Sequence, residues 1–272
     1  MDTQKSLPDI NKLSILIAMI MLTYAVTPFV NFTERSWEFN LFGTVFPIAL
    51  DFSFMVSLIV AAMAATGMDW LMRSHPRFSN QNLIQHQLIP AITAWVIGLP
   101  LGSIQMGLQW WAVFAFGSLF LIIVIVAEYV VLDISDVRFS LASIGLTAIS
   151  FALFLFLSIS AKGAGLRLFL IFPTLCVTIG LISLRILYLR LGLGWSYHWV
   201  VVIAILVGQI AVGLHYWPVS PVSFGLILMA PAYGLTSLTG AIQEDETSRT
   251  FWIEPLIMAT VLILLAFFLR HW

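Results

Sequence analysis

Long apolar stretches separated only by short polar turns dominate this sequence, and each is close to the length of a membrane-spanning helix. A helix needs roughly 20 apolar residues to cross the hydrocarbon core of a bilayer. Backbone groups in lipid must form hydrogen bonds within the protein, which helices do by themselves. The pattern predicts nine spans, with eight the main alternative: residues 13–32, 48–72, 88–106, 110–132, 140–161, 168–189, 199–216, 222–241 and 251–270. We therefore predict an all-α polytopic transmembrane helix bundle.

The composition excludes most other classes of protein. Only 9% of the 272 residues are charged, whereas a soluble domain carries about 25%. Twelve basic and thirteen acidic residues give a net charge of -1, so no basic surface for nucleic acid is expected. Cys176 is the single cysteine, which excludes a disulfide framework and a Cys-x-x-Cys metal site. We recognise no catalytic or cofactor motif, and we expect no cofactor and no metal.

Basic residues flank the spans unevenly. The face that holds the N-terminus collects eight of them: Lys5, Lys12, Arg73, Arg77, Arg138, Arg185, Arg190 and Arg249. The opposite face holds four: Arg35, Lys162, Arg167 and Arg270. The positive-inside rule then places the N-terminus in the cytoplasm. The first apolar run is too long for a signal peptide and lacks a small-residue cleavage site, so we expect an uncleaved span in a cell membrane, the bacterial inner membrane.

The domain organisation is expected to be simple. With only short connections, residues 1–272 form one transmembrane domain. Residues 107–111 (GLQWW) resemble residues 213–217 (GLHYW), and four spans separate them. An even number of spans would make a duplication a parallel repeat of 88–161 by 199–270. Chance matching in a tryptophan-rich chain is the alternative.

Asp51 is one of three acidic residues that lie within predicted membrane spans. Such a residue costs at least about 2.5 kcal/mol inside a span, so it is a functional candidate by default. One interpretation is a proton- or cation-binding carboxylate. Its candidate partners from the same side are His215, Gln209 and Arg35. We favour the other interpretation, in which Asp51 is the N-cap of a helix over 52–72 and Leu41–Leu50 is an interfacial segment.

Glu128 and Glu254 are the other two acidic residues, and both lie near the predicted cytoplasmic ends of spans. Glu254 precedes Pro255, which suits an N-cap followed by proline at the first helical position. Arg185 lies about one turn from the cytoplasmic end of the sixth span. The three side chains could therefore form an inter-helix ion pair. A cytoplasmic gate or headgroup site is the functional alternative.

Polar groups on the opposite side form a second candidate cluster. Gln209 and His215 lie in the seventh span, while Gln105 and Gln109 flank the turn between the third and fourth spans. Such amides usually bond neighbouring helices. His75 and His86 lie in the longest hydrophilic interval without cysteine or acidic neighbours, and we expect solvated loop histidines.

Small residues predict close helix packing. Gly98 and Gly102 have the GxxxG spacing, and Ser57, Ala61 and Ala65 form a ridge on the second span. Both patterns let helix backbones approach each other. We interpret them as packing features rather than as a site.

The second half of the chain resembles an uncharacterised bacterial family of polytopic membrane proteins. The similar stretches are Ala127–Phe139 and Gln209–Gly240, followed by Glu254. The matching residues are Glu128-Tyr129, Tyr216-Trp217-Pro218, Tyr233 and Glu254. The family has no assigned activity, so the resemblance draws attention to Glu128 and Glu254 without implying a function.

Two functions from different classes follow. The first is a non-enzymatic membrane protein, acting as an accessory or scaffold subunit or associated with lipid, with membrane lipid and other membrane subunits as its partners. The alternative is a small secondary transporter, proton-coupled through the intramembrane carboxylates. An intramembrane enzyme that modifies lipids is a distant third.

Overall fold

The computed structural model describes residues 7–30, 35–41, 44–50, 52–75, 83–192, 195–244 and 251–269. In this part of the chain the fold is all-α, with nine helices and one two-stranded hairpin. The chain divides into two compact units, Met1–Ala142 and Ser143–Trp272. The prediction of a helix bundle is confirmed.

Eight of the nine helices are long and apolar enough to cross a membrane, so this is a multi-pass membrane protein. The ninth, α9 (Ile253–Phe268), has 16 residues and a length of about 24 Å. That is shorter than the roughly 30 Å hydrocarbon core. The nine predicted segments thus correspond to nine helices, and eight of them, the alternative count, are long enough to span. The cytoplasmic N-terminus, the single domain and the repeat of 88–161 by 199–270 stay predictions.

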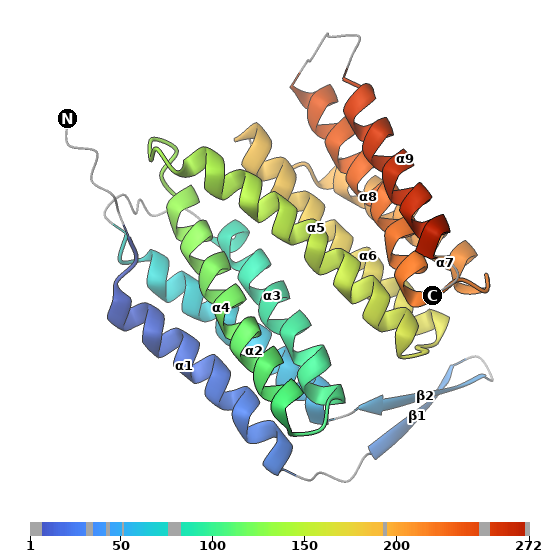
Figure 1. The fold of residues 1–272 in the computed structure, drawn as a ribbon, viewed down its shortest axis with the longest axis horizontal. Coiled ribbons are helices and arrows are strands. Elements are labelled where there is room, and N and C mark those ends of the chain that lie inside the picture. The colour runs from blue at the N-terminus through green and yellow to red at the C-terminus, as the bar shows by residue number, and fades with distance from the viewer. Residues whose placement is uncertain are drawn as a thin grey trace. The chain divides into compact units, whose positions relative to one another are not determined.

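The first unit contains four long helices. Its elements are α1 (Ile10–Val26), η1 (Thr27–Phe29), β1 (Arg35–Leu41), β2 (Thr44–Leu50), α2 (Phe52–Met72), α3 (Ile84–Ser103) and α4 (Leu108–Val131). Helix α2 packs most extensively on α3, α1 packs on α2, and α3 and α4 form a hairpin, as seen in Figure 1. Asp9 caps α1 by accepting a hydrogen bond from the Asn11 backbone N–H.

A β-hairpin precedes α2. Strands β1 and β2 are antiparallel, with Arg35 paired to Leu50 and Leu41 paired to Thr44. Leu41–Leu50 was expected to be an interfacial segment beside the helix, and the structure shows that most of it is the second strand of this hairpin. A paired strand satisfies backbone groups that a lone segment would leave to water or headgroups.

The α2–α3 contact depends on glycines, as the GxxxG spacing predicts. A Cβ atom at Gly98 would collide with the side chains of Ser57 and Tyr24, and one at Gly102 would collide with Ser53. The absence of side chains lets the helices approach closely. The packing prediction for Gly98 and Gly102 is confirmed.

The second unit holds the remaining helices. They are α5 (Phe139–Gly163), whose first turn belongs to the first unit, α6 (Leu168–Leu191), α7 (Tyr197–His215), α8 (Pro221–Gln243) and α9. Helix α6 packs on α7 and α8, and α8 and α9 lie side by side (Figure 1). Gly192 ends α6 with a φ of 58°, which favours glycine. Ser220 caps α8, and Pro221 occupies its first position.

Candidate functional site

A buried histidine–glutamate pair joins α3 to α4 in the first unit. The His86 Nδ1 and Glu128 Oε2 atoms are 3.0 Å apart, and the two side chains are 5% and 0% exposed. His86 is in the first turn of α3, and Glu128 is one turn before the end of α4. The two atoms are within hydrogen-bonding distance, and the donor is set by the histidine tautomer.

The antiparallel hairpin explains why these two residues meet. His86 lies about 26 Å along α3 before that helix ends, and Glu128 lies about 30 Å along α4 after it begins. These similar distances from the turn place both side chains at the same depth. Helix rotation then has to bring them onto facing sides.

A second histidine lies beside the next residue of α4. His75, in the turn after α2, is 3% exposed. Its ring makes an edge contact with Tyr129, with 4.7 Å between ring centroids. His75, His86, Glu128 and Tyr129 are called the His–Glu cluster below.

The expectation that His75 and His86 are solvated loop residues is wrong. Helix α3 begins at Ile84, four residues before the predicted start of that span, so His86 lies within the helix. Both side chains are buried because they cover the end of α4. The signal missed in the sequence was the similar distance of His86 and Glu128 from the α3–α4 turn.

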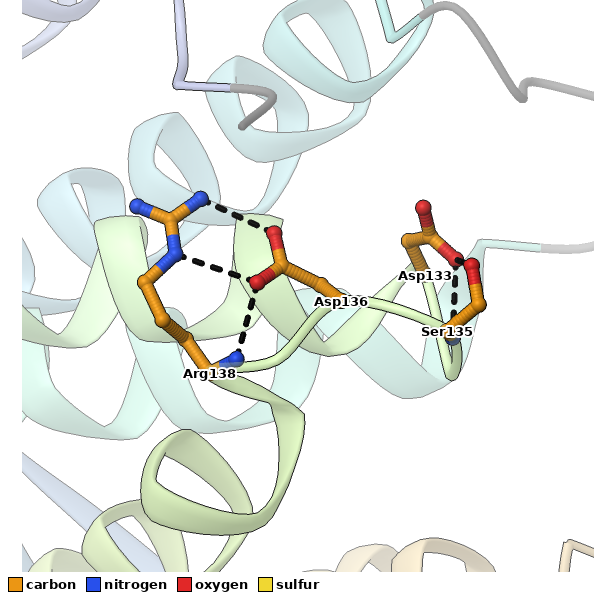
Figure 2. A network of polar contacts seen from close by, with 4 residues as sticks. All are labelled: Asp133, Ser135, Asp136 and Arg138. Carbon is orange, nitrogen blue, oxygen red and sulfur yellow. Dashed lines mark hydrogen bonds and ion pairs between the residues drawn. The ribbon is translucent and has the colours of Figure 1, made fainter. Parts of the chain in front are cut away.

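The turn after the His–Glu cluster is held by two acidic side chains (Figure 2). Asp133 Oδ1 accepts hydrogen bonds from the backbone N–H and the hydroxyl of Ser135, at 2.9 and 2.8 Å. Asp136 accepts from the backbone N–H of Arg138 and from its guanidinium, at 2.8 to 3.1 Å. The hydrogen bonds from Asp136 raise the pKa of Arg138 above its ordinary value, so the guanidinium stays charged. These contacts fix the start of α5 relative to α4.

In the second unit, Glu254 has a different environment from the predicted one. It lies in the first turn of α9, which begins at Ile253, so it is not the N-cap residue. The Glu254 carboxylate is exposed and accepts a hydrogen bond from the Tyr233 hydroxyl at 2.5 Å. The predicted ion pair of Glu254 with Arg185 is therefore wrong. Two residues that carry the family resemblance, Tyr233 and Glu254, are direct partners.

Arg190 makes the ion pair that links α6 to the end of α8. Its guanidinium contacts Glu244 at 2.6 Å and donates to the Ser237 carbonyl at 3.1 Å. A Cβ atom at Gly240 would lie 2.8 Å from this side chain, so the glycine makes room for it. The sequence predicted Arg190 only as a basic residue of one membrane face, and its ion pair with Glu244 was not predicted.

Arg185 is fully buried on α6, and its guanidinium lies 5.8 Å from the centre of the Tyr188 ring. That distance suits a cation–π contact. Arg185 and Glu128 belong to different units, and their predicted pairing stays a prediction.

The predicted polar cluster on the opposite side is only partly tested. Helix α3 ends at Ser103 and α4 begins at Leu108, so Gln105 and Gln109 do not share one continuous helix. His215 is the last residue of α7, and its carbonyl accepts a hydrogen bond from Lys162 at 2.7 Å. Lys162 thus caps α7, a contact that the sequence did not predict. Gln209 is exposed on α7, and its grouping with Gln105 and Gln109 stays a prediction.

Asp51 lies outside the described residues. Helix α2 begins at Phe52, the position that the capping interpretation requires. Among the described residues, no three histidine, cysteine or acidic side chains are placed to hold a metal ion.

Comparison with known proteins places the chain in a family. The family described as a protein of unknown function, DUF5656, matches residues 32–269. The match covers far more than the second half on which the resemblance rested. No curated protein and no solved structure matches the chain. The chain belongs to the DUF5656 family of proteins of unknown function.

Proposed function

We propose that this protein is a non-enzymatic accessory or scaffold subunit of a membrane assembly, in the inner membrane of a bacterium and with a cytoplasmic N-terminus. The main support is a set of polar side chains that form hydrogen bonds between helices. Several polar side chains of the described helices hydrogen-bond to a neighbouring helix, and some of these contacts lie near helix ends. This is how polar groups stabilise a bundle in lipid.

The contacts that support the proposal occur in both units. In the first unit they are His86 with Glu128, the Tyr24 hydroxyl with the Ala94 carbonyl, and the Trp110 indole with the Leu101 carbonyl. In the second unit they are Ser183 with Thr236, Ser223 with the Ala266 carbonyl, Lys162 with the His215 carbonyl, and Tyr233 with Glu254. Each contact crosses between two helices, so these groups hold the structure together.

The short connections point the same way. Apart from the β1–β2 hairpin between α1 and α2, the helices are joined by short segments, so the membrane helices offer most of the surface for other proteins. A subunit of this kind recognises its partner through packing and hydrogen bonds between helices.

The test is purification from native membranes in a mild detergent. We expect a second membrane protein to copurify at a fixed molar ratio that survives washing and gel filtration. An unrelated eight-span protein with the same tag, purified in parallel, controls for adhesion to detergent micelles. A chain that purifies alone and catalyses solute flux in liposomes contradicts the proposal.

The His–Glu cluster favours a second candidate, a proton-coupled transporter. A buried carboxylate within a membrane-spanning helix is a candidate proton-binding group, and Glu128 has an imidazole 3.0 Å away. In this case the reconstituted protein moves solute along a proton gradient, and Glu128→Gln abolishes that coupling. Glu254→Gln is the matched control because its carboxylate is exposed. Flux lost equally in both variants contradicts a carrier role for Glu128.

A further inference from the structure

Two interhelical turns meet at one end of the second unit. Helix α5 ends at Gly163 and α6 begins at Leu168, while α7 ends at His215 and α8 begins at Pro221. The Lys162 Nζ atom donates a hydrogen bond to the His215 carbonyl at 2.7 Å. Because Lys162 is in the last turn of α5, this contact brings the end of α5 to the end of α7.

The turn between α5 and α6 has a fixed backbone. The Leu166 N–H donates to the Ala161 carbonyl at 3.4 Å, and the Gly165 N–H donates to the Lys162 carbonyl at 3.1 Å. Gly165 has a φ of 62°, the left-handed conformation of a Schellman motif. Arg167 follows as the N-cap residue of α6. Lys162 and Arg167 are therefore held at the two ends of one short turn.

These two cations have no acidic partner in the described part of the chain. The sequence contains no aspartate or glutamate between Asp136 and Glu244. Glu244 follows the far end of α8, and Glu254 is in the first turn of α9, so both belong to the opposite end of the unit. Neither Lys162 nor Arg167 forms an ion pair with a described residue. The positive charge at this end is not neutralised by the described helices.

The Lys162 ammonium is held in position by neutral groups. Besides its bond to the His215 carbonyl, it lies 5.4 Å from the centre of the Phe224 ring, which suits a cation–π contact. An ammonium has three donors, so the carbonyl does not use all of them. The His215 Nδ1 atom is buried and has no hydrogen-bond partner among the described residues. Both side chains can therefore bind a further acceptor.

The turn after α7 carries residues typical of the headgroup level of a membrane. Tyr216 and Trp217 follow His215 directly, and these two aromatic residue types concentrate at the membrane–water interface. Basic side chains at that depth meet the phosphates of lipid headgroups. A phospholipid phosphate is thus the anion that the membrane supplies at the level of Lys162.

We propose that Lys162, Arg167 and His215 bind the phosphate of an anionic phospholipid. Lys162 donates to a phosphate oxygen, Arg167 supplies a second positive charge, and His215 donates from Nδ1 when that atom carries the proton. An anionic headgroup is favoured over a zwitterionic one, because two cations lie together without an acidic neighbour. The proposal is independent of the accessory-subunit function, since it requires only lipid.

Lipid titration of the purified full chain tests the site. Phosphatidylglycerol or phosphatidylcholine is added in detergent, and bound lipid is counted by native mass spectrometry. We expect tighter binding of phosphatidylglycerol. Lys162→Gln should lower its affinity about tenfold, the size expected for one hydrogen bond to a charged group. Arg73→Gln is the matched control, because it also removes one charge at a span end but from a residue paired with Asp69.

Two further variants separate binding from folding. Lys162→Gln also removes the contact that caps α7, so its melting temperature is measured without added lipid. Lys162→Arg keeps the charge and should keep most of the affinity. Arg167→Gln leaves the α7 cap intact and should still weaken binding of phosphatidylglycerol.

Four results would overturn the proposal. The first is equal affinity for phosphatidylcholine. The second is the same loss in Arg73→Gln as in Lys162→Gln. The third is equal thermal stabilisation by inorganic phosphate alone, which would indicate a site for a soluble anion. The fourth is unchanged affinity in both Lys162→Gln and Arg167→Gln, as expected if an acidic residue from elsewhere neutralises them. Copurification tests the accessory-subunit proposal separately, so these failures would leave it in place.

Discussion

Removal of the Glu128 carboxylate tests whether the His–Glu cluster holds α3 and α4 together. Glu128→Leu leaves His86 without the partner that lies 3.0 Å from its Nδ1 atom. Both side chains are almost completely buried, so solvent cannot replace the lost contact. A buried polar group left without its hydrogen-bond partner costs about 1–3 kcal/mol. We expect a loss of this size in the free energy of unfolding.

The companion variants separate the charge from the hydrogen bond. Glu128→Gln keeps a carbonyl oxygen that can accept from His86, so its loss should be smaller than that of Glu128→Leu. Replacing both residues by leucine removes the stranded polar group, and stability should partly return. Glu254→Gln is the control for changing a carboxylate that is exposed.

The measurement is equilibrium unfolding in mixed micelles at a fixed pH, followed by circular dichroism. The four chains needed for a double-mutant cycle are the wild type, Glu128→Leu, His86→Leu and the double variant. Strictly additive losses would refute the coupling. A Glu128→Leu protein within about 0.5 kcal/mol of the wild type would refute the whole argument for a buried pair.

Two further predictions concern packing and hydrogen bonding. Gly98→Ala should destabilise the first unit by about 1–3 kcal/mol, because its new Cβ atom would collide with Ser57. Gly145→Ala has open space around it and should be neutral or slightly stabilising; equal melting temperatures for the two variants would contradict this. Tyr233→Phe should cost about 1 kcal/mol and should mask any effect of Glu254→Gln, which a double-mutant cycle checks.

Glu128 and Glu254 illustrate what can and cannot be predicted from the sequence. Both were selected because an acidic residue next to an apolar run is costly in lipid. The structure gives each a neutral or basic partner from a neighbouring helix. Neither partner was predicted, because partner choice depends on how two helices rotate and slide against each other. Hydropathy along one helix carries no information about either quantity.

The sequence by itself determined the number and approximate limits of the helices. Burial in lipid requires a continuous apolar run for each span, and that requirement acts on consecutive residues. It also determined that Gly98 and Gly102 are packing residues, since the spacing that places two glycines on one face is local. Only the tertiary structure decided that His86 is buried beside Glu128 and that Lys162 caps α7. Those contacts join residues 42 and 53 positions apart, and the three-dimensional packing of the helices alone brings such residues together.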